Sequence, residues 1–237
     1  MSYCLKFVKN DIKEAKEIIL GSDNYGKDMK PLGLGHSGAT ILGYRNAAIK
    51  RERMNPDDGE CTWHGHSLTT SQIDKYMELS KIGMERGYHF IPYLDCIKKD
   101  LNTFSFMPKI TGATIKSADG LKSLLEIGTR GLKVFFNDYV GLHEIGFVAD
   151  NNELADNYLV GFKNIFMFDM NVTQSPEQNK EKLVTQAMHE VFNCWHYSMD
   201  DDKKRMFKEH VGNIRDALKL VGHNTEALNK LSNIVTY

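Results

Sequence analysis

The chain has 237 residues, of which 41% are hydrophobic and 26% are charged, and its formal net charge is −1. This length can bury a core as one large domain or as two lobes. A charge this close to zero excludes a global field that would recruit nucleic acid or an acidic membrane. No apolar window of about eighteen residues is present, so we expect no membrane span.

The cysteines are widely spaced and form no C-x-x-C pair; they are Cys4, Cys61, Cys96 and Cys194. This spacing favours reduced thiols in a cytosolic setting over a disulfide framework. The N-terminus, MSYCLKFVKNDIKEAKEII, carries charges among its apolar positions and is not typical of a Sec-type signal peptide. A non-Sec secretion route would leave no signal of this kind.

Residues 5–20 predict a helix, because Ile12, Ala15, Ile18 and Ile19 recur with helical spacing. Gly21 and the polar residues after it predict its end. We expect this helix to pack on the first lobe of the protein.

The stretch Pro31–Glu52 carries the first chemical pattern. Gly33, Gly35 and Gly38 give G-x-G-x-x-G, and two short β-type runs follow, ending in Ala47-Ala48-Ile49-Lys50 with a turn at Arg45-Asn46. A dinucleotide-binding loop would instead lead into a helix. A glycine loop followed by a strand lysine is the order that protein kinases use to cover and hold ATP phosphates.

A helix is predicted over Ser71–Arg86. Its Glu78 is the candidate ion-pair partner of Lys50, with Glu85 as the rival and a solvated helix glutamate as the alternative interpretation. The preceding loop contains Cys61, His64 and His66, which could bind a metal. No second pair with zinc-site spacing lies nearby, so incidental histidines in a polar loop are the favoured interpretation.

Two strands are predicted next, His89–Asp95 and Thr103–Met107, separated by a loop over Cys96–Asn102. Met107 opens the run M-P-K-I-T-G, which is similar to a kinase hinge whose backbone groups hold an adenine edge. Phe104 or Phe106 would line the pocket; alternatively both belong to the core.

The second chemical stretch is Gly146–Val172. Two apolar runs flank Gly161-Phe162-Lys163-Asn164 and predict a β-hairpin. Asp150 precedes the hairpin, Asn157 begins it and Asp169 ends it, so we expect three oxygen-bearing side chains at one edge. Such ligands suit a hard cation such as Mg²⁺, completed by phosphate and water.

Residues 31–172 resemble the protein-kinase-like superfamily. The family positions fall on Gly33, Gly35, His36, Ser37 and Gly38 for the glycine loop, Lys50 and Glu78 for the ion pair, Met107 for the hinge, Asp150 for the catalytic aspartate, and Asn157 and Asp169 for the metal ligands. The resemblance implies a bilobal α+β fold with an N-lobe over 1–109 and a reduced helical C-lobe over 110–237. It also implies ATP and Mg²⁺ as cofactors and a protein hydroxyl as acceptor.

The sequence departs from the family pattern around Asp150. It has V-A-D in place of H-R-D, and Asn157 follows Asp150 by seven positions rather than five. Asp156 or Asn152 could serve in place of Asp150. The absent H-R-D arginine implies activity that is constitutive or switched on by a partner. No A-P-E follows Asp169, and little chain remains for a second lobe.

The reduced size resembles the minimal kinases that bacterial pathogens inject by type III secretion, including the virulence effectors that phosphorylate a host Hsp-ninety-type chaperone. Phage and virus-borne kinases share this style. The resemblance implies a monomer with a cytoplasmic-type fold, secreted by a non-Sec route into a host cell, that phosphorylates Ser or Thr of a host protein. It implies no nucleic-acid partner. A kinase-fold AMP transferase and a partner-binding pseudokinase are the alternatives.

The remaining chain is predicted to be helical after a polar loop at Asn171–Asn179. The expected helices cover residues 117–127, 130–145, 180–198, 203–211, 213–221 and 225–234. Asp200, Asp201 and Asp202 could bind a metal, but a solvated charge cluster at a helix start is favoured.

Overall fold

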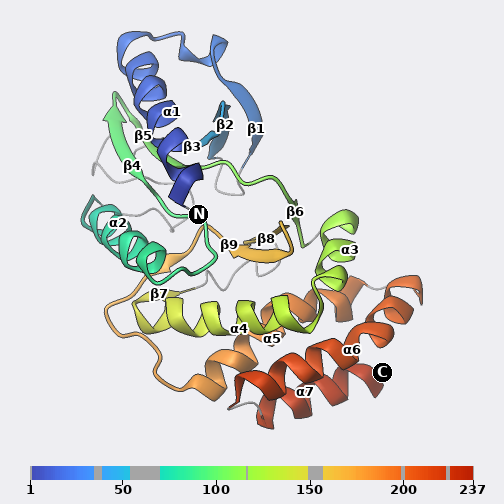
Figure 1. Cartoon of the computed structure of the whole chain (residues 1–237). Coiled ribbons are helices and arrows are strands. Elements are labelled where there is room, and N and C mark those ends of the chain that lie inside the picture. The colour runs from blue at the N-terminus through green and yellow to red at the C-terminus, as the bar shows by residue number, and fades with distance from the viewer. Residues whose placement is uncertain are drawn as a thin grey trace. The chain divides into compact units, whose positions relative to one another are not determined.

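The computed structural model describes residues 2–34, 39–53, 70–115, 117–148, 157–198, 201–222 and 225–236 (Figure 1). Within these ranges it contains seven α-helices and ten β-strands, which confirms the predicted α+β class. The chain separates into two compact units. Unit 1 comprises Met1–Lys81 and Ile91–Ile110, and unit 2 comprises Ile82–Phe90 and Thr111–Tyr237. No helix in the described ranges is long and apolar enough to cross a membrane.

Unit 1 is built on an antiparallel five-stranded sheet with the order β1-β2-β3-β5-β4. The strands are β1 (Lys30–Leu34), β2 (Thr40–Tyr44), β3 (Ala47–Arg53), β4 (Asp95–Lys99) and β5 (Asn102–Pro108). The predicted turn at Arg45-Asn46 is confirmed, and Arg45 adopts a φ of 50° in it. A register shift between Pro31 and Gly33 makes β1 irregular where it enters the glycine-rich segment.

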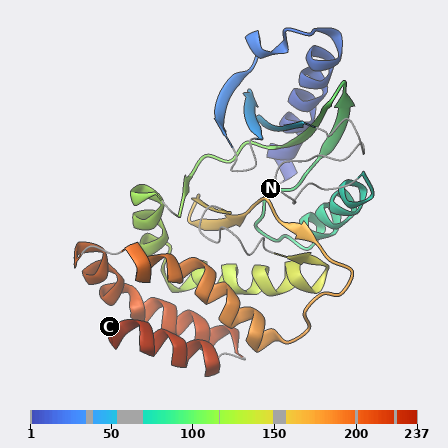
Figure 2. The same cartoon turned by 180° about the vertical axis from the view of Figure 1, so that it is seen from behind.

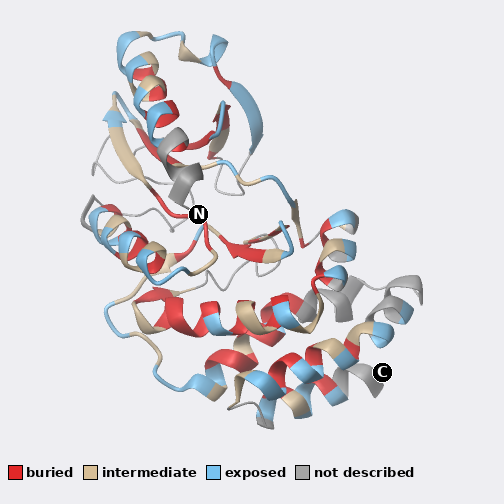
Figure 3. Cartoon of the chain, viewed as in Figure 1, coloured by how far each residue is buried: buried red, intermediate tan, exposed pale blue. Residues whose placement is uncertain are grey.

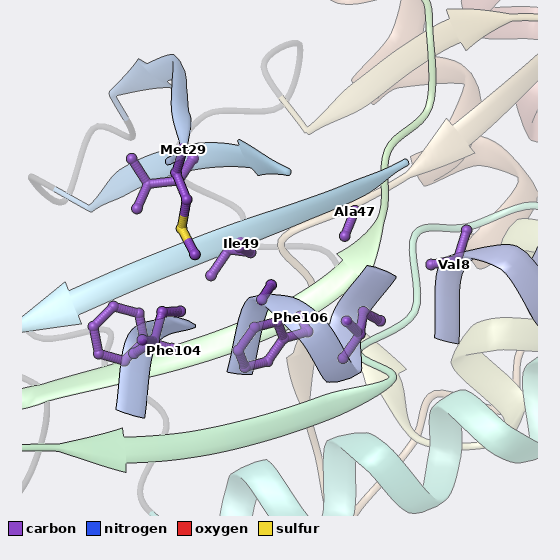
Figure 4. Close-up of a cluster of buried hydrophobic side chains, with 10 residues drawn as sticks. Val8, Met29, Ala47, Ile49, Phe104 and Phe106 are labelled. Carbon is purple, nitrogen blue, oxygen red and sulfur yellow. The ribbon is translucent and has the colours of Figure 1, made fainter. Parts of the chain in front are cut away.

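Alternation along the strands divides the sheet into two faces, because successive side chains of a strand point to opposite sides. One face is covered by helix α1 (Ser2–Gly21), as the sequence predicts. Their shared core, shown in Figure 4, consists of Val8, Ile12, Ala15, Ile19, Met29, Leu42, Ala47, Ile49, Phe104 and Phe106. Polar contacts fix the helix at its edges: Tyr44 donates to Glu14 at 3.0 Å, and Lys16 pairs with Asp95 at 2.6 Å.

A strand was predicted at His89–Asp95, between helix α2 (Thr70–Glu85) and β5, and this prediction is wrong. Phe90, Ile91 and Tyr93 are buried, but the strand in this region is β4, which begins at Asp95 and occupies most of the predicted loop. Phe90 forms an isolated bridge to Met167, and no ladder continues through residues 91–94, so the apolar run mainly reflects burial. Pro92 lies inside it and has no N–H to contribute to a ladder.

Unit 2 combines short strands with most of the helices. Its strands are β6 (Ala113–Thr114), β8 (Tyr158–Gly161) and β9 (Asn164–Met167) in one sheet of order β6-β8-β9, and β7 (Phe147–Val148) paired with β10 (Asn171–Val172). Its helices are α3 (Ala118–Glu126), α4 (Gly128–Glu144), α5 (Lys180–Ser198), α6 (Asp201–Val221) and α7 (Thr225–Thr236). Helices α4 to α7 pack together, as Figures 1 and 2 show from opposite sides.

Helix α4 is the centre of unit 2 and is buried along most of its length, as Figure 3 shows. It packs against α5, α6 and the strand β9. The predicted break between Val211 and Asn213 is wrong, because α6 continues through Gly212. Its buried residues Val211, Ile214 and Leu218 keep a helical period across the glycine. This packing outweighs the cost of a mid-helix glycine, about 1 kcal/mol.

Candidate functional site

Lys50 lies on the sheet face opposite to α1, because it alternates along β3 with the core residue Ile49. Its cross-strand neighbours on that face are Ile41 of β2 and Ser105 of β5. Only 11% of the Lys50 side chain is exposed, and Ser105 is buried. The strand thus holds an ammonium group at a largely desolvated position, where its charge interacts strongly with any anion that reaches it.

Beside Lys50, the next row across the same face consists of Gly43, Ala48 and Met107. A Cβ added to Gly43 would lie 3.0 Å from the Leu32 side chain of β1, so the glycine makes room for that leucine. Two small residues therefore form a shallow floor, and Leu32 and Met107 are the larger apolar side chains of this row. We name Leu32, Ile41, Gly43, Ala48 and Met107 the apolar floor. These residues make this part of the sheet face apolar.

Phe104 and Phe106 do not belong to this floor. Both lie in the core beneath α1, on the face opposite to Lys50, so the core interpretation of these aromatics holds. Met107 is displaced from them by the strand alternation and lies on the Lys50 face.

Among the described residues, Glu52 provides a carboxylate beside Lys50. The Lys50 Nζ atom and the Glu52 Oε1 atom are 3.1 Å apart, and only 17% of the Glu52 side chain is exposed. Glu78, the predicted partner, lies on α2 with 60% of its side chain exposed and pairs with Lys75 at 2.9 Å. Glu52 was not among the predicted partners of Lys50, although residues two apart on a strand share a face and this alternation could have indicated it.

Gly33 lies exposed on β1 at the edge of the glycine loop. The other predicted loop residues, Gly35, His36, Ser37 and Gly38, lie outside the described residues, as does Asp150. The alternatives Asn152 and Asp156 and the possible metal ligands Cys61, His64 and His66 also lie outside them.

In unit 2, the predicted hairpin is confirmed as β8 and β9. Tyr158 pairs with Met167 at its open end, and the Phe168 N–H donates to the Asn157 carbonyl at 3.0 Å. Asp169 is the next residue. The fold therefore brings Asn157 and Asp169 to the same end of the hairpin, as the sequence pattern predicts.

The chain on both sides of Asp150 is also held at this end. Asn171 pairs with Val148, and the Thr173 N–H donates to the Gly146 carbonyl at 2.8 Å. The chain thus leaves β7 beside the residues that follow Asp169 and returns at Asn157. Val148 and Asn157, the described residues on the two sides of Asp150, thus both lie next to the Asp169 region.

Asp169 adopts a φ of 52°, a left-handed conformation that is uncommon for residues other than glycine. Aspartate tolerates it better than most residues, and such strained positions occur often at functional sites. Asn157 and Asp169 supply oxygen atoms of the kind that Mg²⁺ prefers. The described residues contain no group of three His, Cys, Asp or Glu side chains that could hold a metal, so an ion here would need other ligands such as phosphate and water.

The buried carboxylate of Glu190 is hydrogen-bonded to the β8–β9 hairpin. Glu190 of α5 is 1% exposed and accepts hydrogen bonds from the hydroxyl groups of Tyr158 and Tyr139 and from the Gln186 amide; the latter two are both 2.8 Å long. Burial raises the pKa of Glu190, although these hydrogen bonds favour its ionised form. Tyr158 directly follows Asn157, so this network fixes the start of β8 next to a candidate metal ligand.

His143, at the end of α4, is a packed residue in the same region. Its Nδ1 atom lies 2.9 Å from the Tyr139 carbonyl, and its ring stacks on the Tyr139 ring at 4.2 Å. Burial lowers the pKa of His143, which favours the neutral ring. Its position therefore indicates support of α4 rather than proton transfer.

Comparison with known proteins adds no functional assignment: a scan against protein-family models finds no matching family, and a search of curated proteins finds no significant match. Within unit 1, the geometry offers a cation beside a flat apolar surface. Within unit 2, it offers paired oxygen ligands at a hairpin end. These two sets are the functional candidates.

Proposed function

We propose that this protein is an ATP- and Mg²⁺-dependent protein kinase with a reduced, bilobal kinase-like fold. The observation that carries the proposal is the row of Lys50 and the apolar floor on one face of the unit 1 sheet. ATP combines a flat base with a polyanionic chain, and this face combines a flat apolar surface with a largely buried cation. The glycine loop between β1 and β2 would supply backbone amides to the phosphates.

Magnesium would be held by Asn157 and Asp169. Their common position at the hairpin end supports this role, because two oxygen ligands leave coordination sites for phosphate oxygens and water. The left-handed backbone of Asp169 also supports it, since an aspartate at a strained position has a local cost that a function can explain.

In the proposed reaction, a hydroxyl oxygen of the protein substrate forms a bond to the γ-phosphorus of ATP. The bond from that phosphorus to the bridging oxygen breaks, ADP leaves, and the hydroxyl proton passes to a carboxylate. Asp150 is our candidate for that carboxylate, with Asp156 as the alternative. Lys50 would neutralise phosphate charge, so positioning and electrostatics would supply most of the rate enhancement.

The substrate expected from the resemblance is a Ser or Thr of a host protein such as an Hsp-ninety-type chaperone, reached after non-Sec secretion of a monomeric effector. Incubation with Mg²⁺, ATP and a host-cell lysate, followed by phosphosite mass spectrometry, tests this expectation. A mass increase matching AMP would instead support a nucleotide transferase. Stabilisation by ATP without any product would support a pseudokinase.

The residue assignments are tested with variants that keep the fold. Lys50→Ala and Asp169→Ala should abolish transfer of radiolabelled phosphate while the thermal transition of the protein stays cooperative. The matched controls are Lys30→Ala, at an exposed lysine of β1, and Asp100→Ala, at an exposed aspartate with the same φ of 52°. Both controls should keep activity. Full activity of Lys50→Ala and Asp169→Ala would overturn the proposal.

A further inference from the structure

The turn of the β8–β9 hairpin carries an unexpected residue pair. Gly161 pairs with Asn164, and the two residues between them, Phe162 and Lys163, have φ values of 50° and 60°. A two-residue turn with both φ values positive favours Asn-Gly, because left-handed backbone is costly for larger side chains. A bulky aromatic residue at the first position is therefore not explained by the needs of the turn.

The Phe162 side chain does not recover this cost by packing. It is 75% exposed, which is the highest value among the exposed large hydrophobic residues of the described chain. Leu220, the next in that group, is 58% exposed and lies on a helix rather than a strained turn. Phe162 thus combines an unfavourable backbone conformation with an unburied ring. A backbone outlier of this kind is an indication of function.

The turn is held firmly from two sides. A Cβ on Gly161 would lie 2.5 Å from the Thr111 carbonyl oxygen, and a Cβ on Gly131 of α4 would lie 3.0 Å from the Lys163 carbonyl oxygen. The Asn164 amide also donates to the Phe162 carbonyl at 3.1 Å. The backbone beneath the ring is therefore fixed before any partner arrives. A pre-organised anchor loses less conformational entropy on binding.

Two cations lie close to the turn in the chain. Lys163 is exposed and follows Phe162 directly, and Arg130 is exposed and precedes Gly131, the α4 residue that the turn contacts. Neither cation forms an ion pair with another residue in the part of the chain that the structure describes. Because the whole chain has a net charge of −1, two cations without an ion pair near this turn are a local feature rather than a general one.

We propose that Phe162, Lys163 and Arg130 form a docking tip for an acidic protein segment that also carries apolar side chains. Phe162 would insert between apolar side chains of the partner, and the two cations would pair with its carboxylates. A single aromatic ring buries about 150–250 Å², which suits a protein-interface anchor. Stable membrane attachment needs a larger apolar anchor or a polybasic patch.

The docking tip lies at the opposite end of the hairpin from Asn157 and Asp169. Each strand has four residues, so the two ends are separated by about 13 Å of strand. In the kinase proposed above, on which this part of the inference rests, the tip would hold the protein substrate away from the phosphates. It would therefore affect substrate affinity and leave the transfer of phosphate to water unchanged.

The test uses the full chain without ATP and a fluorescent peptide that alternates glutamate with leucine and phenylalanine. Fluorescence anisotropy should show binding that weakens with salt and that falls by about tenfold or more in the double variant Phe162→Asn, Lys163→Gly. This variant supplies the preferred turn residues, so its Tm should be unchanged or higher. The matched control is Leu101→Asn, at an exposed leucine in the β4–β5 turn, which should bind the peptide normally.

Three results would overturn the docking tip. They are no binding of the acidic peptide by the wild-type chain, equal binding by the double variant, and equal binding of the same peptide with lysine in place of glutamate. Loss of binding to phosphatidylserine vesicles in the double variant, without loss of peptide binding, would also overturn it in favour of a membrane surface. Because no step uses ATP, a failure of the kinase proposal would leave this result intact, and the reverse also holds.

Discussion

The backbone N–H of Phe168 donates a 3.0 Å hydrogen bond to the carbonyl of Asn157, and this bond closes the open end of the β8–β9 hairpin. It places Asp169 one residue beyond the closure, where its φ becomes 52°. Two oxygen-bearing residues separated by a whole hairpin in the sequence are thus adjacent in the fold. Because glycine also adopts a positive φ, substitution of Asp169 by glycine removes the side chain and keeps this backbone conformation.

The first prediction concerns the backbone and the side chain of Asp169. Asp169→Gly should keep a cooperative unfolding transition, because glycine adopts a positive φ without a steric cost. The same change should abolish phosphate transfer, since the candidate metal ligand is lost. Asp100→Gly relieves the same conformation in the β4–β5 turn and should keep activity. Urea denaturation and a radiolabelled-ATP assay measure the two effects; an active Asp169→Gly protein would contradict the metal assignment.

The second prediction compares two lysine–glutamate pairs of unit 1. Glu52→Ala should lower the free energy of unfolding by about 1–3 kcal/mol, because it removes a carboxylate from a largely buried ammonium group. Glu78→Ala removes the partner of Lys75 from an exposed pair, and its effect should stay within about 0.5 kcal/mol. Chemical denaturation of both variants checks the difference. Equal effects would show that burial does not distinguish the pairs.

The third prediction concerns the pH dependence of stability at Glu190. Its ordinary pKa is 4.5, and burial raises the pKa in the folded state. As the pH rises above about 4.5, the unfolded chain therefore loses this proton first and becomes relatively more stable. The contribution of Glu190 to stability is thus fully present below that pH and is lost as the pH rises through the folded-state pKa.

Glu190→Gln removes this titration. The wild-type protein minus the variant should show a difference in unfolding free energy that falls with rising pH and then levels off. Urea denaturation at a series of pH values measures it, and Glu209→Gln on the exposed surface of α6 controls for the loss of a carboxylate. A difference that increases with pH would mean that the hydrogen bonds from the tyrosines outweigh burial.

The fourth prediction uses two glycines in different surroundings. Gly161→Ala would place a Cβ 2.5 Å from the Thr111 carbonyl oxygen, so it should destabilise unit 2 by about 1–3 kcal/mol. Gly212→Ala lies within α6 with no atom within 4 Å of the new Cβ. It should stabilise the protein by about 0.5–1 kcal/mol through helix propensity. Thermal denaturation distinguishes the two, and a neutral Gly161→Ala would refute the close backbone contact.

Local sequence patterns determined several parts of the fold. The alternation in Ala47-Ala48-Ile49-Lys50 predicted a strand, and the paired apolar runs around Phe162-Lys163 predicted a hairpin with Asn157 and Asp169 at one end. Helical spacing predicted α1 and its packing role. These features depend on residues that are neighbours along the chain, so their periodicity is visible without tertiary contacts.

Only the tertiary structure decided which buried groups meet. The apolar run before Asp95 has the composition of a strand, but its burial comes from packing, and β4 forms next to it. Whether Glu78 reaches Lys50 depends on how α2 packs, and in the structure Glu78 is exposed and pairs with Lys75. Glu190 meets Tyr139 and Tyr158 across long stretches of chain. Contacts of this kind depend on the packing of distant elements, which no local period encodes.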